Sequence, residues 1–97
     1  MSYVLKIKPQ AIAQAAEIYA YHQGIDQRLA DRFSKELDAC YAFIERNPIG
    51  FQVRKKNYRH AMVKRFRYRV VFALIGQEVV VFQIRHTSRR PSKKFGP

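Results

Sequence analysis

The sequence predicts an α+β domain with the element order β-α-α-β-β-β, in which a helical hairpin packs on one face of an antiparallel sheet. Between residues 9 and 46, apolar residues recur every three or four positions, as in helices with one buried side. Between residues 58 and 85 they alternate or run together, which is typical of strands. The 97 residues contain no linker or repeat, so residues 1–97 form one predicted domain with a basic tail from about residue 87.

A short strand with one buried face is predicted at the beginning of the chain. Its inward residues are Tyr3, Leu5 and Ile7, which alternate with Val4, Lys6 and Lys8. Pro9 ends this strand and suits the first turn of a helix. The positions that then fall at helical spacing are Ile12, Ala16, Tyr19 and Gln23. Gly24 is expected to end the helix.

The second predicted helix begins after Asp26, because an aspartate side chain commonly caps a helix N-terminus. Its apolar stripe consists of Leu29, Phe33, Leu37, Cys40, Tyr41 and Ile44. Asn47-Pro48 is expected to end it. Only Gly24 and Ile25 separate the two helices, so we expect an αα-hairpin.

Strands make up the rest of the predicted fold. They span Tyr58 to Lys64, Tyr68 to Ile75 and Val79 to Arg85. Gly76-Gln77 joins the last two, and glycine in the first central position suits a type II′ turn. The middle strand has one apolar face, made by Tyr68, Val70, Phe72 and Leu74. The last strand is apolar on both faces.

Positive charge is concentrated in the second half of the chain. Residues 1–45 hold five Lys or Arg and six Asp or Glu, whereas residues 46–97 hold fourteen and one. A field of this strength favours a polyanionic partner, either nucleic acid or an acidic protein, and makes binding salt-dependent. A surface that is merely solubilising usually mixes both signs.

The single cysteine, Cys40, excludes an intramolecular disulfide and a zinc site built from several cysteines. It is expected to pack in the core. The first ten residues lack the features of a signal peptide, and the longest apolar run is too short to cross a bilayer. We therefore expect a cytoplasmic protein with no membrane partner.

The helical hairpin can cover only one face of the sheet, which leaves the other face and the strand ends exposed. The arginines expected to gather there are Arg59, Arg65, Arg67, Arg69, Arg85, Arg89 and Arg90. Their mutual repulsion lowers stability unless an anion relieves it, so a ligand explains them better than folding does.

Several segments together resemble the RelE/ParE superfamily of type II toxin-antitoxin toxins. They are the Asn47-Pro48 break followed by Gly50, the segment RHAMVKRFRY at 59–68, the strand residues at 79–81 and HTSRRP at 86–91. The likeness covers nearly the whole chain. The step KRFRY at 64–68 looks like the ParE or plasmid-stabilisation branch, although Arg67 stands where that branch commonly has proline.

The resemblance implies a growth-inhibiting toxin that a cognate antitoxin, often acidic, holds inactive. Within the family, ParE-like toxins inhibit DNA gyrase and are not enzymes. RelE-like toxins are mRNA interferases, metal-independent endoribonucleases that cut mRNA on the ribosome. Neither mechanism uses a cofactor. Inhibition of gyrase is the preferred interpretation and ribosome-dependent cleavage is the alternative.

Cleavage would require the 2′-OH to lose a proton, the leaving oxygen to gain one, and a charged phosphate to be stabilised. For that mechanism the predicted catalytic residues are His86, as proton carrier, with Arg65 and Arg85 on the phosphate. His86 is explained equally well as a structural or binding residue. Under either mechanism the residues predicted to bind the target are Arg59, Lys64, Arg65, Arg67, Arg85, Arg89 and Arg90.

A metal site and a binding module without toxicity are two further interpretations. His22, His60 and His86 are scattered along the chain, so no metal site is expected, and His60 is interpreted as a sheet-surface residue. A non-toxic nucleic-acid-binding module with the same basic face is a third interpretation of the function. A double-stranded RNA-binding domain has the order α-β-β-β-α, which this chain does not match.

Overall fold

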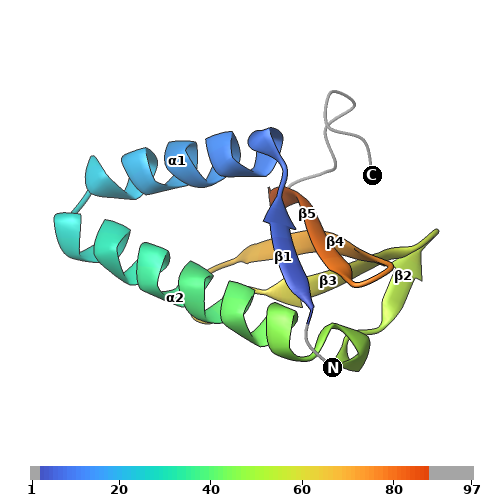
Figure 1. Ribbon diagram of the computed structural model, residues 1–97. Helices are drawn as coiled ribbons and strands as arrows, with labels where there is room; N and C mark the ends of the chain where they lie inside the picture. Colours follow the sequence, from blue (N-terminus) through green and yellow to red (C-terminus); the bar gives the residue numbers. More distant parts are fainter. Residues whose placement is uncertain (1–2, 88–97) are drawn as a thin grey trace.

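The computed structural model describes residues 3–87 as two helices beside a five-stranded mixed sheet (Figure 1). In chain order the elements are β1 (Val4–Ile7), α1 (Pro9–Gln23), α2 (Gln27–Arg46), the short 3-10 helix η1 (Pro48–Gly50), β2 (Val53–Lys55), β3 (Tyr58–Met62), β4 (Tyr68–Ile75) and β5 (Glu78–His86). The strands lie in the order β1-β5-β4-β3-β2. The predicted α+β class and the helical hairpin are confirmed.

Two features of the sheet differ from the prediction. The sheet is not wholly antiparallel, because β1 pairs with β5 in parallel, with Leu5 opposite Val79. The alternating pattern of a strand identifies its buried face, but it does not identify its partner or its direction. The fifth strand is β2, whose residues Val53, Arg54 and Lys55 are all exposed. A three-residue strand with no buried side has no periodic signal in the sequence.

The helix ends follow local chemistry. Pro9 occupies the first turn of α1. The side chain of Asp26 caps α2 by accepting a hydrogen bond of 2.9 Å from the backbone N–H of Arg28. Gly24 follows α1 as predicted, but its φ of −65° is right-handed, so the chain turns there without the left-handed conformation that favours glycine.

The two helices differ in how well the sequence predicts their buried side. In α2 the apolar stripe is confirmed, with Phe33, Leu37 and Ile44 buried. In α1 the buried residue is Ala11, whereas Ile12 is 56% exposed. Alanine and other apolar side chains occur on every side of α1, so periodicity alone does not identify the side that packs.

The β4–β5 hairpin has the predicted two-residue turn. Gly76 has a φ of +63°, whereas the φ of Gln77 is not positive. This combination matches a type II′ turn. The pairing shifts by one residue because Phe82 is an extra residue of β5 between the partners of Val71 and Phe72. Beyond the end of β1, the Gln14 side chain of α1 accepts a hydrogen bond of 2.7 Å from the backbone N–H of Ile84.

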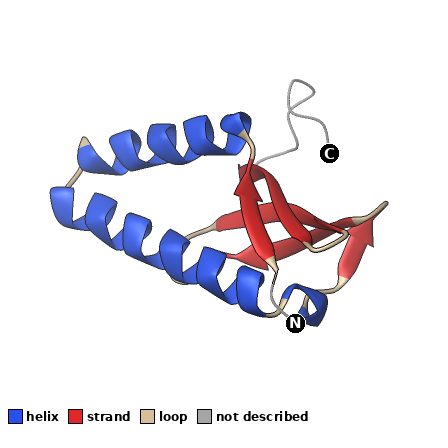
Figure 2. Cartoon of the chain, in the orientation of Figure 1, coloured by secondary structure: helices blue, strands red, loops and turns tan. Residues whose placement is uncertain are grey.

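One main core lies between the helices and the sheet. Figure 2 shows the helices and the strands as separate layers. The core residues of the strands include Val70, Phe72, Val79 and Val81, which face Phe33 and its neighbours on α2. Side chains alternate along a strand, so the residues between them point away from the helices. We call the side with Val70 and Phe72 the helix-covered face and the opposite side the open face.

Candidate functional site

The open face brings Arg69 and Arg85 together. These two residues are direct partners in the antiparallel β4–β5 pair, so their side chains project from the same face. Both side chains are half-buried. Like charges placed opposite each other in this way destabilise a sheet. The pairing therefore puts two guanidinium groups where folding alone disfavours them.

His60 of β3 lies beside this pair. A terminal nitrogen of the Arg69 guanidinium is 3.3 Å from Nδ1 of His60. Arginine can only donate, so Nδ1 accepts this hydrogen bond when the imidazole is neutral and carries its proton on Nε2. Burial and, after it, the positive charges of Arg69, Arg54 and Arg85 lower the pKa of His60. We call Arg54, His60, Arg69 and Arg85 the cationic cluster.

The charges of the cationic cluster are not paired within the described chain. Among residues 3–87 the ion pairs are Lys6 with Glu78 and Arg28 with Asp26, at 3.2 Å each. Neither pair includes a member of the cluster. The Nε of Arg69 is buried and makes no hydrogen bond to any described residue. The cluster thus combines unpaired positive charge with a buried donor.

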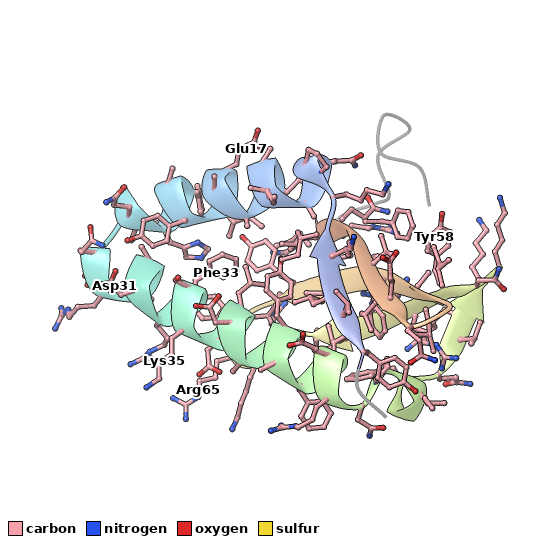
Figure 3. All side chains as sticks on the ribbon, in the orientation of Figure 1. Glu17, Asp31, Phe33, Lys35, Tyr58 and Arg65 are labelled. Carbon is pink, nitrogen blue, oxygen red and sulfur yellow. The ribbon has the colours of Figure 1, made fainter. Side chains whose placement is uncertain are left out.

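Aromatic rings lie farther along the same face. The rings of Tyr58 and Phe82 meet edge to face, with centroids 5.2 Å apart. The ammonium group of Lys8 lies 5.9 Å from the centroid of the Phe82 ring. In Figure 3, Tyr58 lies on the side of the sheet away from α2. The residues Val71, Ala73 and Val80, which share this face by strand alternation, are short and buried.

His86 does not lie with the cationic cluster. It is the residue after Arg85 on β5, so its side chain points to the helix-covered face. There its ring meets Tyr68 edge to face at 5.2 Å, and Tyr68 in turn contacts Phe33 and His22. The predicted catalytic pair of His86 and Arg85 is therefore divided between the two faces.

Arg59 also differs from its neighbours in orientation. It pairs with Phe72 across β3–β4, which places its side chain on the helix-covered side of the sheet. Its guanidinium group donates a hydrogen bond to the backbone carbonyl of Phe51. Arg59 thus ties the segment after η1 to the sheet, and its role in binding the target stays a prediction.

The remaining predicted residues lie in or after the β3–β4 turn. Lys64, Arg65 and Arg67 are exposed there. Arg65 has a φ of +70°, in the left-handed region, and Phe66 closes the turn with a backbone hydrogen bond of 3.2 Å to Val63. Figure 3 shows Arg65 at the end of the sheet away from Tyr58. Arg89 and Arg90 lie outside the described residues.

Of the four members of the cluster, only Arg85 is among the residues predicted to bind the target, and Arg69 is predicted only to lie on or around the uncovered face. Arg54 is on β2, the strand without a periodic signal, and the sequence predicts only a sheet-surface position for His60. The signal that groups them is register, because Met62 pairs with Arg69 and His60 lies two residues from Met62 on the same face. The register of this strand pairing is known only once the structure is known.

The thiol of Cys40 is buried in the core. Burial raises the pKa of the Cys40 thiol to about 11, so the thiol stays protonated at neutral pH. Its Sγ lies 3.6 Å from the backbone oxygen of Met62. Residues 3–87 contain no group of three or more His, Cys, Asp or Glu side chains placed to hold a metal ion. Neither α1 nor α2 is long and apolar enough to cross a membrane.

Comparisons with known proteins agree with this architecture. The family model for the ParE toxin of the type II toxin-antitoxin system parDE matches residues 5–91. A solved structure described as the chromosomal ParDE TA system from P. aeruginosa is similar in fold, with a TM-score of 0.79. The match covers 90% of this chain and 98% of that chain at 15% sequence identity. A search of curated proteins found no match.

Proposed function

Because the chain belongs to the ParE toxin family of type II toxin-antitoxin systems, we propose that it arrests growth by inhibiting DNA gyrase unless its antitoxin is bound. The match to the ParE family model carries this preference over RNA cleavage, and it is supported by the predicted catalytic pair, because the imidazole of His86 and the guanidinium of Arg85 project from opposite faces of β5. Binding a target requires only the cationic cluster. Cleavage requires a proton carrier beside the phosphate.

The antitoxin is the second partner in this proposal. The open face carries unpaired positive charge, and an acidic segment that covers the cationic cluster would neutralise it. Such a segment would also exclude the target by occupying the same surface. The antitoxin encoded beside the toxin is therefore expected to restore growth and gyrase activity together.

Ribosome-dependent mRNA cleavage stays as a second candidate because of one residue. His60 is an imidazole within reach of Arg69, with a pKa lowered by burial and neighbouring charge. A neutral imidazole at neutral pH is a competent general base. If the protein cleaves RNA, His60 rather than His86 lies with the phosphate-binding groups on the open face.

Two assays with the purified full-length protein separate these candidates. The first measures supercoiling of relaxed plasmid by gyrase, and the second maps cuts by primer extension on an mRNA in a purified translation system. We expect inhibited supercoiling, relief by the antitoxin and an intact message. Active gyrase together with cuts in A-site codons would overturn the proposal. The His60→Ala and His86→Ala variants would then identify the proton carrier.

A further inference from the structure

Arg69 is the most constrained member of the cationic cluster. Its Nε is buried without a hydrogen-bond partner among residues 3–87, and one terminal nitrogen is directed at His60. A guanidinium group cannot lose its charge in a protein, and a buried donor left unbonded destabilises the fold. The side chain is therefore better matched to a bound acceptor than to the free protein.

The surroundings of Arg69 specify that acceptor as an anion. Arg85 is its direct partner across β4–β5, and Arg54 is close enough to affect the pKa of His60. The described carboxylates that form ion pairs, Asp26 and Glu78, pair with other residues. A carboxylate or a phosphate can accept two hydrogen bonds from the guanidinium fork and relieve the repulsion between the arginines.

The aromatic pair favours a nucleic acid over an acidic protein. Tyr58 lies two residues before His60 on β3, and strand geometry separates the two Cα atoms by about 6.6 Å. Tyr58 is half-buried and meets Phe82 edge to face. A carboxylate side chain needs no such ring, whereas a base beside a bound phosphate can stack on one.

We propose that Arg69, Arg85 and His60 bind a phosphodiester group of a nucleic-acid strand, with Arg54 adding attraction and Tyr58 contacting the adjacent base. This rests on the proposed function in that DNA held by gyrase supplies the strand. It goes further in assigning the contact to nucleic-acid phosphate rather than to gyrase protein. His60 is the reporter of occupancy, because a bound anion favours the imidazolium form and raises its pKa.

The test uses the full-length protein, a short oligothymidylate and NMR titration of the His60 ring. We expect the oligothymidylate to raise the pKa of His60, and Arg69→Gln to weaken binding about tenfold through lost charge-assisted hydrogen bonds. The variant should also lower the slope of log affinity against log salt by about 0.7. Lys35→Gln, on the exposed side of α2, removes the same charge and should leave the His60 response intact.

Three outcomes would overturn the proposal. Equal weakening by Arg69→Gln and Lys35→Gln would mean that attraction is non-specific. An unchanged His60 titration with bound oligothymidylate would place the strand elsewhere. A rise in the pKa of His60 with an acidic peptide, but not with the oligothymidylate, would assign the face to a protein partner.

A second variant guards against loss of folding. If Arg69→Gln fails to fold, Arg69→Lys keeps the charge and removes Nε, and it should still weaken oligothymidylate binding by several-fold.

The oligothymidylate result can also be separated from the test of the proposed function. Oligothymidylate binding at His60 without inhibition of gyrase would contradict only the proposed function. Inhibition of gyrase without oligothymidylate binding would contradict only the phosphate site.

Discussion

The helix-covered face and the open face are built from alternate residues of the same strands, yet they are suited to opposite tasks. On β4, Val70 and Phe72 are fully buried against the helices, whereas Arg69 projects from the other side beside His60. The helix-covered face has apolar packing, which stabilises a fold without regard to any ligand. The open face has charge that opposes folding until an anion binds.

A small domain can in this way separate stability from binding. The helical hairpin covers only one side of the sheet, and strand alternation assigns every second residue to the other side. Substitutions on the two faces should therefore have distinct signatures. Those on the helix-covered face should lower the free energy of unfolding, and those that change charge on the open face should lower activity.

The largest expected effect comes from reversing charge on the open face. Arg69→Glu combined with Arg85→Glu should abolish growth inhibition, because each change replaces an attractive contact of about tenfold in affinity with a repulsive one. Thermal unfolding should show an intact fold, since repulsion across β4–β5 is not increased. Growth of cells expressing the double variant is the measurement.

The matched control reverses two charges on α2. Arg32→Glu combined with Lys35→Glu changes net charge by the same amount on exposed helix positions. We expect it to arrest growth like the wild type. Equal loss of toxicity in both double variants would show that overall charge, rather than the open face, is responsible.

The next effect contrasts the same substitution on both faces. Phe72→Ala removes a ring that is 0% exposed and should lower the free energy of unfolding by about 3–5 kcal/mol. Phe82→Ala removes a half-buried ring of the open face and should lower it by about 1–2 kcal/mol. Urea unfolding of both variants measures the difference. Similar losses would mean that the open face contributes to stability as the core does.

A smaller effect is expected in the β3–β4 turn. Arg65 has a φ of +70°, which costs an L-residue about 1–2 kcal/mol relative to glycine. Arg65→Gly should therefore raise the free energy of unfolding by up to about 1 kcal/mol, after the greater flexibility of glycine in the unfolded chain is included. The same variant sharpens the assignment of the site. If Arg65 binds the target as the sequence predicts, toxicity should fall while stability rises.

The smallest effect is a pH dependence from His60. Its folded pKa is lowered from the usual value of 6.5, so the unfolded chain binds more protons than the folded chain just below that pH. Stability should fall as the pH drops from 6.5 through the folded pKa. Unfolding curves at pH 7.5 and pH 5 should show a smaller fall for His60→Gln than for the wild type. An equal fall would mean that His60 is not perturbed.

The sequence predicts most of the fold because local signals agree along it. Pro9, the Asp26 cap and the stripe of α2 each identify an element whose bounds the structure reproduces closely. The missed features are those without a local cause. Exposed β2 has no buried side, and the parallel direction of β1 depends on a partner 74 residues later, with Leu5 opposite Val79.

The candidate site is less predictable from sequence because it depends on orientation. Adjacent residues such as Arg85 and His86 read as one motif, yet the pleat sends them to opposite faces. Arg59 and His60 are divided in the same way. Charge composition predicts that a polyanion binds, whereas strand register determines which cations meet it.

Inhibition of gyrase by three forms of the protein tests the role of the open face most directly. The measurement is the concentration of wild type, Arg69→Gln and Lys35→Gln that halves supercoiling of relaxed plasmid. We expect the wild type and Lys35→Gln to inhibit at the same concentration and Arg69→Gln to require at least about tenfold more. Equal inhibition by all three would contradict the claim that the open face is the working surface of this toxin.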